Sequence, residues 1–275
     1  MSCARLLACV VLAAAGCGPD PRADEPCSEV GDTLRCPHHT GKVAGDGLGR
    51  AVHFKAPPGR SPPPGGWPVV VLFQGSFDAA EWLWTGTKGD ALGTDHQTAT
   101  IRALLDAGFL VVTPEAHFGG FWFWDTNITP YGEAWEIAPD HQLMKNLFAA
   151  LESGGFGEVN MGRLYAAGMS SGGYMTSRMA IAYPGRFRAL AIHSASFATC
   201  SSFICAMPPK LPADHPPTLF LHGDADPIVP IGTMRDYRKL LDANGTENAE
   251  LVDAKVGHRW LPEAPTAIRD FFLAH

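Results

Sequence analysis

The sequence predicts an α/β fold in which one mostly parallel, doubly wound sheet forms a single domain. Short apolar runs, typical of strands buried on both faces, alternate with longer segments in which apolar residues recur at helical spacing. The chain has 275 residues, of which 46% are hydrophobic and 18% charged, which is enough to build one full core. A Gly-rich turn, Gly168-Met169-Ser170-Ser171-Gly172, lies between one predicted strand and the next helix. No internal repeat or second domain is evident.

The first residues predict an export signal. Residues 1–16 carry one positive charge, Arg5, followed by an apolar run over 6–15 that is too short to span a bilayer. The end of this run, residues 13–17, resembles a bacterial lipobox in which Cys17 would carry lipid, and ordinary cleavage nearby is the alternative. We therefore expect an exported protein, either secreted or held at the bacterial cell envelope by a lipid anchor at Cys17, with no other membrane contact.

Four cysteines remain after this signal and Cys17: Cys27, Cys36, Cys200 and Cys205. An even number of cysteines in an exported protein suggests disulfides, and the local pairings Cys27–Cys36 and Cys200–Cys205 are favoured among the three possible. A metal site at Cys36, His38 and His39 is a weaker interpretation, because the cysteine has a disulfide to form. We expect no metal and no cofactor.

The charge of the chain excludes one class of partner. There are 21 basic and 28 acidic residues, giving a net charge of −7. Removal of residues 1–16 takes away Arg5 and leaves 20 against 28, a net charge of −8. Because a nucleic-acid-binding protein would show a basic patch, we expect no nucleic-acid partner.

The elements follow in order after a tether and N-terminal loop over residues 17–48. The catalytic domain is expected to span 49–275. Strands are predicted over 49–56, 69–73, 109–113, 189–193, 218–221 and 250–254, with a further strand from 163 to the Gly-rich turn. Helices are predicted over 99–107, 138–152, from the turn to 183, and over 230–243 and 264–273. Strands that alternate with helices imply a parallel sheet covered on both faces.

The Gly-rich turn is the G-x-S-x-G pattern of a nucleophile elbow, with a strand before it and a helix after it. Gly168 and Gly172 remove the side chains that would clash in so sharp a turn. Ser170 would then be exposed at a helix N-terminus, where free N–H groups favour developing negative charge. The alternative is an ordinary Gly/Ser turn.

A serine nucleophile needs a base and an orienting carboxylate, which in a doubly wound sheet lie beyond the strand ends. Asp226 and Asp224 both follow the strand over 218–221, and we prefer Asp226 as the orienter, with Asp224 capping the turn. His258 follows the last predicted strand and is the expected base, with His193 its main rival. The chain order Ser170, Asp226, His258 fits this interpretation.

An oxyanion hole needs two preorganised N–H donors. The backbone N–H of Ser171, directly after the nucleophile, is the first expected donor. The second should come from the loop after the strand over 69–73, where Gly75 permits a tight bend. We predict the backbone N–H of Ser76, with Phe77 as the second choice.

With these motifs placed, residues from about 49 to the C-terminus resemble the polyhydroxybutyrate depolymerase-like and feruloyl esterase-like serine esterases of the α/β-hydrolase superfamily. The resemblance is carried by residues 163–176, by the acid loop His222-Gly-x-x-Asp226-x-x-Val229-Pro230, and by Gly257-His258-x-Trp260. It implies a carboxylic ester hydrolase. Gln74 stands where the family usually has His, and Ser76 where it usually has Cys. We expect no separate polymer-binding domain.

Aromatic residues after the strand over 109–113 suggest a hydrophobic substrate, because this is the catalytic edge of the sheet. The candidate substrate-binding residues are Phe77, Phe121, Trp122, Trp124 and Trp260. The expected substrate is a polyester of the polyhydroxyalkanoate type or a hydrophobic aryl ester, polymeric or short. Feruloyl or acetylxylan esters of plant cell walls are the alternative, and a peptidase or a non-catalytic ligand-binding lipoprotein is favoured less.

Overall fold

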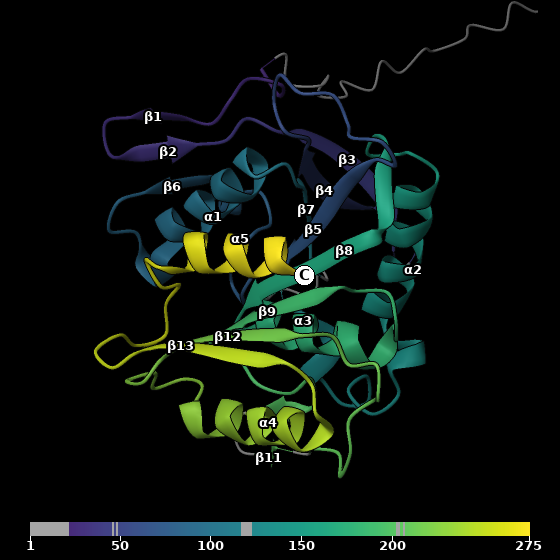
Figure 1. Cartoon of the computed structure of the whole chain (residues 1–275), viewed down its shortest axis with the longest axis vertical. Helices are drawn as coiled ribbons and strands as arrows, with labels where there is room; N and C mark the ends of the chain where they lie inside the picture. Colours follow the sequence, from purple (N-terminus) through teal and green to yellow (C-terminus); the bar gives the residue numbers. More distant parts are fainter. Residues whose placement is uncertain (1–21, 46, 48, 117–122, 202–203, 206) are drawn as a thin grey trace, which may run out of the picture.

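The computed structural model describes residues 22–275 except 46, 48, 117–122, 202–203 and 206. Within this part of the chain an eight-stranded sheet has the order β13-β12-β9-β8-β5-β7-β4-β3. Its strands are β3 (His39–Ala44), β4 (Gly49–Lys55), β5 (Trp67–Phe73), β7 (Leu110–Pro114), β8 (Val159–Met169), β9 (Ala189–His193), β12 (Thr218–Gly223) and β13 (Asn248–Asp253). The strands from β13 to β7 pair in parallel, and β4 and β3 add an antiparallel edge (Figure 1).

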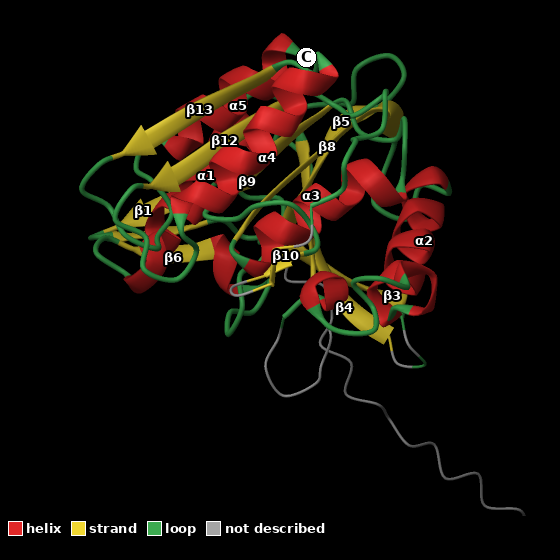
Figure 2. Ribbon diagram, turned by 90° about the horizontal axis from the view of Figure 1, so that it is seen from below, coloured by secondary structure: helices red, strands yellow, loops and turns green. Residues whose placement is uncertain are grey.

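Helices cover both faces of the sheet, as Figure 2 shows from below. They are α1 (Thr94–Asp106), α2 (Pro139–Glu152), α3 (Ser171–Ala182), α4 (Ile231–Asn244) and α5 (Ala264–Ala274), with short 3-10 turns at Trp82–Trp84, Ala91–Gly93, Asp125–Asn127 and Trp135–Ile137. The expected α/β-hydrolase fold is confirmed. The predicted helices and core strands are all present, with ends that differ by a few residues.

The alternation of side chains along each strand divides the core into two layers. Val69, Val71 and Phe73 of β5 pack with α2 and α3, whereas Val70 and Leu72 pack with α1 and α5. This follows from the two-residue period of a strand, which sends successive side chains to opposite faces. Every residue of β5 is buried, as the continuous apolar run predicts. A third cluster joins α3 to α4.

The chain changes direction across the sheet at β5. Residues after β5 return through α1 to β7 on one side, and the chain then passes through α2 to β8 on the other side of β5. Phe73 at the end of β5 lies in register with Gly168 near the end of β8. Ligands of doubly wound sheets bind outside the carboxyl ends of strands at such a switch point. The loops after β5 and β8 are therefore placed where a site is expected.

The N-terminal segment differs from the expected tether and loop over 17–48. Three strands form there: β3 at the edge of the main sheet, and β1 (Ser28–Val30) and β2 (Thr33–Arg35), which pair with β6 (Thr85–Thr87) in a small separate sheet. All three residues of β1 are exposed, and β3 shows only weak alternation of buried and exposed residues. Their sequences are therefore mostly polar and lack the apolar pattern by which a strand is predicted. Residues 28–30, 33–35 and 39–44, which were predicted as loop, form strands.

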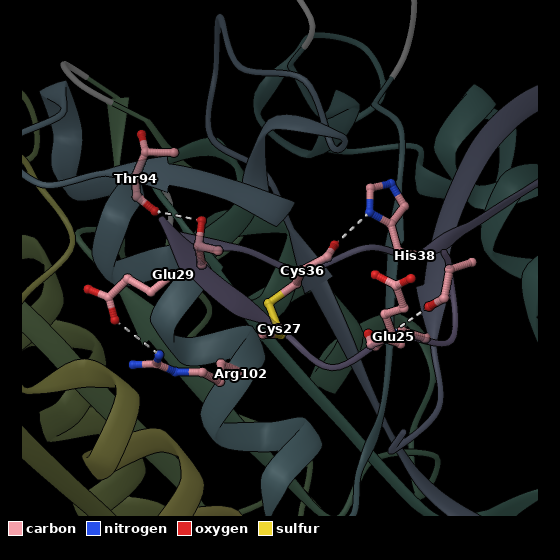
Figure 3. Close-up of a disulfide and its surroundings, with 10 residues drawn as sticks. Glu25, Cys27, Glu29, Cys36, His38, Thr94 and Arg102 are labelled. Carbon is pink, nitrogen blue, oxygen red and sulfur yellow. Dashed lines mark hydrogen bonds and ion pairs between the residues drawn. A yellow bond between two sulfur atoms is a disulfide. The ribbon is translucent and has the colours of Figure 1, made fainter. Parts of the chain in front are cut away.

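A disulfide cross-links this segment internally, and polar contacts attach it to the rest of the domain. The predicted disulfide Cys27–Cys36 is present, as Figure 3 shows, and His38 contacts the carbonyl of Cys36. Glu29 pairs with Arg102 of α1 at 3.7 Å. The buried ammonium of Lys55 donates to the carbonyls of Ala23 and Glu25. Residues 23–36 therefore contact the body of the domain, although they lie before the boundary at residue 49 that the sequence suggested.

A two-stranded ladder lies beyond β9, between β10 (Cys200–Ser201) and β11 (Ile204–Cys205). Cys200 is disulfide-bonded, and its register partner is Cys205. The Cys205 side chain lies outside what the structure describes, so the pairing Cys200–Cys205 stays a prediction. Cys17 also lies outside the described residues.

Candidate active site

The turn between β8 and α3 has the geometry of a nucleophile elbow. Ser170 has φ 54° and ψ −123°, a conformation that costs free energy for a residue with a side chain. Its backbone N–H donates to the carbonyl of His193 at 3.0 Å, and its carbonyl accepts from Tyr174 N–H at 3.0 Å. The serine is therefore held in a strained conformation between the end of β9 and the first turn of α3.

The glycines around Ser170 are required by contact with neighbouring backbone. A Cβ added to Gly168 would lie 2.3 Å from the carbonyl oxygen of Gly172. One added to Gly172 would lie 2.1 Å from that of Phe73, and one added to Gly173 would lie 2.5 Å from Ala195 Cβ. No real Cβ approaches backbone so closely. The close packing of α3 against β5 thus explains why glycines are needed at these positions.

The loops that carry Asp226 and His258 are bound to each other. Ala225 N–H donates to the carbonyl of Val256 at 3.1 Å, and Asp224 N–H to that of Asp253 at 2.8 Å. His258 Nδ1 lies 2.7 Å from Asp226 Oδ2, and both side chains are almost fully buried. Of the two candidate acids, Asp226 is therefore the one that contacts His258.

Asp226 also performs the turn-capping that we expected of Asp224. Its Oδ1 accepts from the backbone N–H groups of Ile228 at 2.8 Å and Val229 at 2.9 Å. Asp224 is exposed and its side chain instead lies 3.5 Å from Arg235. Asp226 is thus fixed through one oxygen and free to orient His258 through the other.

A second histidine lies beside the same carboxylate. Buried His222 bonds through Nε2 to the Val229 carbonyl at 2.9 Å and lies 3.5 Å from Asp226 Oδ2. Burial alone would raise the pKa of the Asp226 carboxyl, but hydrogen bonds from His222, His258 and Val229 outweigh burial and hold that pKa well below its usual range. The carboxylate therefore stays charged at neutral pH, as an orienter of a histidine must.

His193, the rival base, has other contacts. Its ring is fully buried and stacks on Trp260 at 4.8 Å, and its Nε2 accepts from Leu261 N–H at 2.9 Å. Burial, with the charges of His222 and His258, lowers the pKa of His193 well below its ordinary value. A neutral imidazole whose Nε2 already accepts a hydrogen bond cannot serve as the base for Ser170.

Ser170 and His258 line one pocket, a cavity of about 190 Å³. The residues that complete its wall come from three separate loops, from the end of β8 and from α1: Gly75, Ser76, Phe77, Asp78, Leu92, Gln97, Met169 and Ile228. Most of the wall is apolar. Phe77, Leu92 and Ile228 are 66%, 45% and 58% exposed, so the pocket has a hydrophobic rim that faces solvent.

The rim is built on strained backbone. Among the described residues four non-glycine residues have positive φ, and three of them, Phe77 (62°), Leu92 (58°) and Ser170 (54°), line this pocket. Leu92 is held by its carbonyl, which accepts from Trp260 N–H at 2.7 Å. Strain of this kind concentrates at functional sites.

The loop over residues 75–78, here called the donor loop, lies directly beside the nucleophile. A Cβ added to Gly75 would lie 3.8 Å from Ser170 Cβ and 3.6 Å from the Met169 carbonyl. Ser76 and Phe77 both line the pocket. The backbone N–H of Ser171 begins α3 on the other side of Ser170. The residues that carry the two predicted oxyanion donors, Ser76 and Ser171, are therefore both close in the chain to atoms that contact or adjoin Ser170.

The donor loop is held by a polar group that sequence reasoning did not assign. Buried Gln74 donates from Nε2 to the carbonyl of Asp78 at 2.7 Å and to Glu115 Oε1 at 3.1 Å. Glu115 Oε2 in turn accepts from Ala80 N–H at 3.0 Å. Burial raises the pKa of Glu115, and it raises that of Asp78 to about 6, helped by the charge of Glu115.

The candidate substrate-binding aromatics have different fates. Phe77 lines the pocket. Trp124 and Trp260 were expected to contact substrate, but both are buried in the core and neither lines the pocket. Their indole N–H groups bond to the Gln74 carbonyl and to Thr100 Oγ1, each at 3.0 Å. Phe121 and Trp122 lie outside the described residues.

Leu92, Met169 and Ile228 are pocket residues that the sequence analysis missed. Each is one apolar residue on a loop or strand end, a pattern too common to signal a site. Among the described residues no three His, Cys, Asp or Glu side chains gather so as to hold a metal ion. The same part of the chain contains no helix with the length and hydrophobicity to cross a bilayer.

Comparison with known families agrees with this fold. A family model described as Phospholipase/Carboxylesterase matches residues 111–275. The chain belongs to this family of α/β hydrolases and is a carboxylic ester hydrolase. It is similar to the poly(3-hydroxyoctanoate) depolymerase of Pseudomonas fluorescens, with 40% identity over 98% of this chain and 99% of that protein.

Solved structures share the fold at low sequence identity. Est1E from Butyrivibrio proteoclasticus has a TM-score of 0.56 and 14% identity, covering 86% of this chain and 98% of its own. The Bacillus cereus carboxylesterase has a TM-score of 0.56 and 13% identity, covering 82% of this chain and 94% of its own. At such identities the likeness establishes the fold alone.

Proposed function

We propose that this protein hydrolyses hydrophobic carboxylic esters, and polyesters with apolar side groups in particular, through a Ser-His-Asp mechanism. The observation that carries the proposal is the shared pocket: Ser170 and His258 line it together, and Asp226 is bonded to His258 from behind. The carboxyl ends of three different strands supply these groups.

In this mechanism Ser170 Oγ attacks the ester carbonyl while His258 Nε2 accepts its proton. His258 then gives the proton to the leaving alcohol, and water releases the acid from the acyl-enzyme in a second, equivalent cycle. Asp226 holds His258 through Nδ1, which leaves Nε2 to face the serine. No metal or cofactor is needed for any step.

The negative charge on the attacked oxygen would be stabilised by two backbone donors. Ser171 N–H lies at the first turn of α3, where the helix dipole adds to the effect. Ser76 N–H belongs to the donor loop, and Ser76 lines the same pocket as Ser170. Preorganised donors of this kind contribute about 10²–10³-fold each to kcat in serine hydrolases.

The substrate class follows from the pocket rim and from the relative. Phe77, Leu92 and Ile228 present apolar side chains to solvent around Ser170, which favours an ester with a hydrophobic acyl or side group. The relative with 40% identity is named for poly(3-hydroxyoctanoate), a polyester with apolar side groups. An exposed hydrophobic rim also suits a substrate that is itself an insoluble surface.

Cell-wall esters are less well supported. That alternative relied on aromatics that could stack on sugars or ferulate, and Trp124 and Trp260 are in the core. Phe77 is the aromatic residue among the pocket's described lining. A non-catalytic ligand-binding lipoprotein would not need Ser170 and His258 in one pocket, so this alternative is also less well supported.

We further propose that the protein is exported. The proposal rests on the signal-like residues 1–16, on the lipobox-like sequence ending at Cys17, and on the Cys27–Cys36 disulfide, which is typical of oxidising compartments. Mass spectrometry of the mature N-terminus tests it. A diacylglyceryl group on Cys17 supports the anchor, a nearby free N-terminus supports secretion, and an intact Met1 contradicts both.

The mechanism is tested with Ser170→Ala. We expect kcat on 4-nitrophenyl octanoate to fall by at least about 10⁴-fold and labelling by a fluorophosphonate to be lost. Ser153→Ala, an exposed serine outside the pocket, is the matched control and should leave both unchanged. Undiminished turnover by Ser170→Ala would defeat the mechanism.

The substrate class is tested by a panel. Rates should be higher on 3-hydroxyoctanoate oligomers than on 3-hydroxybutyrate oligomers, methyl ferulate or acetylated xylan. Replacement of the rim residue Ile228 by Ser should reduce the preference for octanoate over acetate esters, because less apolar surface meets the chain. A preference for ferulate or acetylated xylan would replace the polyester proposal with the cell-wall alternative.

A further inference from the structure

One buried tryptophan contacts both sides of the proposed oxyanion hole. The backbone N–H of Trp124 donates to Ser171 Oγ at 2.9 Å. Its indole Nε1–H donates to the carbonyl of Gln74 at 3.0 Å. Ser171 supplies the first proposed donor through its N–H, and Gln74 is the residue from which the donor loop departs. Trp124 therefore connects the start of α3 with the start of the donor loop, the two segments whose relative position the oxyanion hole depends on.

Packing limits the freedom of both segments further. The Trp124 ring meets Phe73 edge-on, with ring centroids 5.0 Å apart, at the end of β5. The Gln74 carbonyl that accepts from the indole is also in close contact with α3, since a Cβ on Gly172 would lie 2.4 Å from it. The tryptophan thus fixes the junction at which β5, the donor loop and α3 meet.

The residue after the tryptophan belongs to a buried polar cluster formed by Asp125, Asp140 and Arg50. The next residue, Asp125, donates from its backbone N–H to Asp140 Oδ2 at 2.6 Å and accepts from Asp140 N–H through its own Oδ2 at 3.0 Å. Asp140 lies in the first turn of α2 and pairs with Arg50 of β4. This reciprocal pair connects Trp124 to two elements that do not contribute to the pocket lining.

On the basis of the proposed function, we infer that Trp124 is a positioning residue that sets the spacing of the two oxyanion donors, Ser171 N–H and Ser76 N–H. It does not touch substrate, because it is fully buried and absent from the pocket wall. Its effect falls on the transition state, since the donors serve the oxyanion that forms there and contribute little to ground-state binding.

A matched control exists in the same molecule. Trp84 is also fully buried, and its indole N–H donates to Thr113 Oγ1 at 2.8 Å. It packs in the layer with α1 and α5 and does not line the pocket. Trp124→Phe and Trp84→Phe each remove one buried indole hydrogen bond, so they should cost similar stability and differ in catalysis.

The experiment compares kcat, KM and the affinity for a trifluoromethyl ketone carrying an octyl chain, which forms a tetrahedral oxyanion on a serine. For Trp124→Phe we expect kcat to fall about 10- to 100-fold, inhibitor affinity to fall by a similar factor, and KM to change less than about twofold. Trp84→Phe should leave all three near wild type. Near-ultraviolet circular dichroism and Tm establish that both variants are folded.

A second variant protects the test against misfolding of the first. Ser171→Ala keeps the backbone donor and removes the hydroxyl that accepts from Trp124 N–H. It should lower kcat and inhibitor affinity in parallel, and the double variant should lose less than the product of the two single effects.

The inference fails if Trp124→Phe and Trp84→Phe change kcat equally, or if Trp124→Phe changes KM alone. Either result leaves the proposed mechanism intact as long as Ser170→Ala is inactive. An active Ser170→Ala enzyme would instead overturn the proposed function, so the two failures are distinguishable.

Discussion

The nucleophile elbow and the donor loop lie side by side at the same edge of the sheet, yet they are held in different ways. The elbow is fixed by local sterics, since Gly168, Gly172 and Gly173 allow backbone contacts that no other residue permits. The donor loop is fixed by side chains from distant parts of the chain, Trp124 and Glu115, which meet at Gln74. One site can thus combine a turn whose geometry is determined by consecutive residues with a loop whose position depends on residues that are distant in the sequence.

The largest effect is expected where the elbow's sterics are broken. Gly172→Ala places a Cβ about 2.1 Å from the Phe73 carbonyl oxygen, so the free energy of unfolding should drop by at least about 4 kcal/mol and activity should be lost. Gly232→Ala in α4, where a Cβ meets nothing within 4 Å, should instead be neutral or stabilise by up to about 1 kcal/mol. Urea unfolding measures both, and equal stability of the two variants would contradict the steric account.

A cross-link outside both regions separates stability from catalysis. Loss of Cys27–Cys36 in the Cys27→Ala/Cys36→Ala variant should lower the free energy of unfolding by about 2–3 kcal/mol, because the unfolded chain regains the freedom of a short loop. Neither residue lines the pocket, so kcat at 20 °C should not change. If kcat fell together with stability, the activity losses of the other variants could not be assigned to the active site.

A smaller effect is expected when the donor loop loses its polar support. Gln74→Leu removes the amide that binds the Asp78 carbonyl and Glu115, so the loop should shift and kcat should fall about tenfold, with about 1–3 kcal/mol lost in stability. Steady-state kinetics on 4-nitrophenyl octanoate are compared with those of the disulfide variant. An unchanged kcat would show that the loop is held without Gln74.

The smallest effect concerns charge in the donor loop. The pKa of Asp78 is raised from 3.8 to about 6, chiefly by burial, so the folded state keeps a proton that the unfolded state has lost between these values. Stability should therefore fall as the pH rises from about 4 to about 6 and stay lower above that range. Asp78→Asn removes this loss and should stabilise the protein by about 1 kcal/mol at pH 8 and hardly at pH 3.5.

Tm measurements at the two pH values test this prediction, and equal shifts at both would contradict it.

Asp226, in the same site, should have the opposite effect on how stability depends on pH. Its pKa is depressed, so its contribution to stability is present above the ordinary carboxyl pKa and is lost as the pH falls below it. The two carboxylates should thus pull the acid side of the stability profile in opposite directions.

Sequence reasoning succeeded where the determinants are consecutive. The buried strands, the helices between them and the sharp turn at Ser170 all follow from apolar period and glycine spacing. The preferred acid, Asp226, is the one that contacts His258. The family assignment and ester hydrolysis are confirmed by the comparisons. The roles of individual site residues remain predictions until the variants are measured.

The remaining features depend on contacts between distant residues. Aromatic density after β7 suggested a substrate surface, but Trp124 turns inward because its indole finds the Gln74 carbonyl and its ring finds Phe73. Trp260 is likewise taken up by stacking on His193. The short strands near the N-terminus were missed because a disulfide and a buried lysine stabilise them, and neither contribution has a hydrophobic period.

The contacts of Lys55 with Ala23 and Glu25 have a consequence for proteolytic trimming of the enzyme. The ammonium is buried, and both of these acceptors are main-chain carbonyls. Cleavage of the chain after residue 25 would remove both carbonyls and leave a buried charge without them, which is strongly unfavourable. A protease that cuts at this point would therefore destabilise the whole enzyme as well as shorten it.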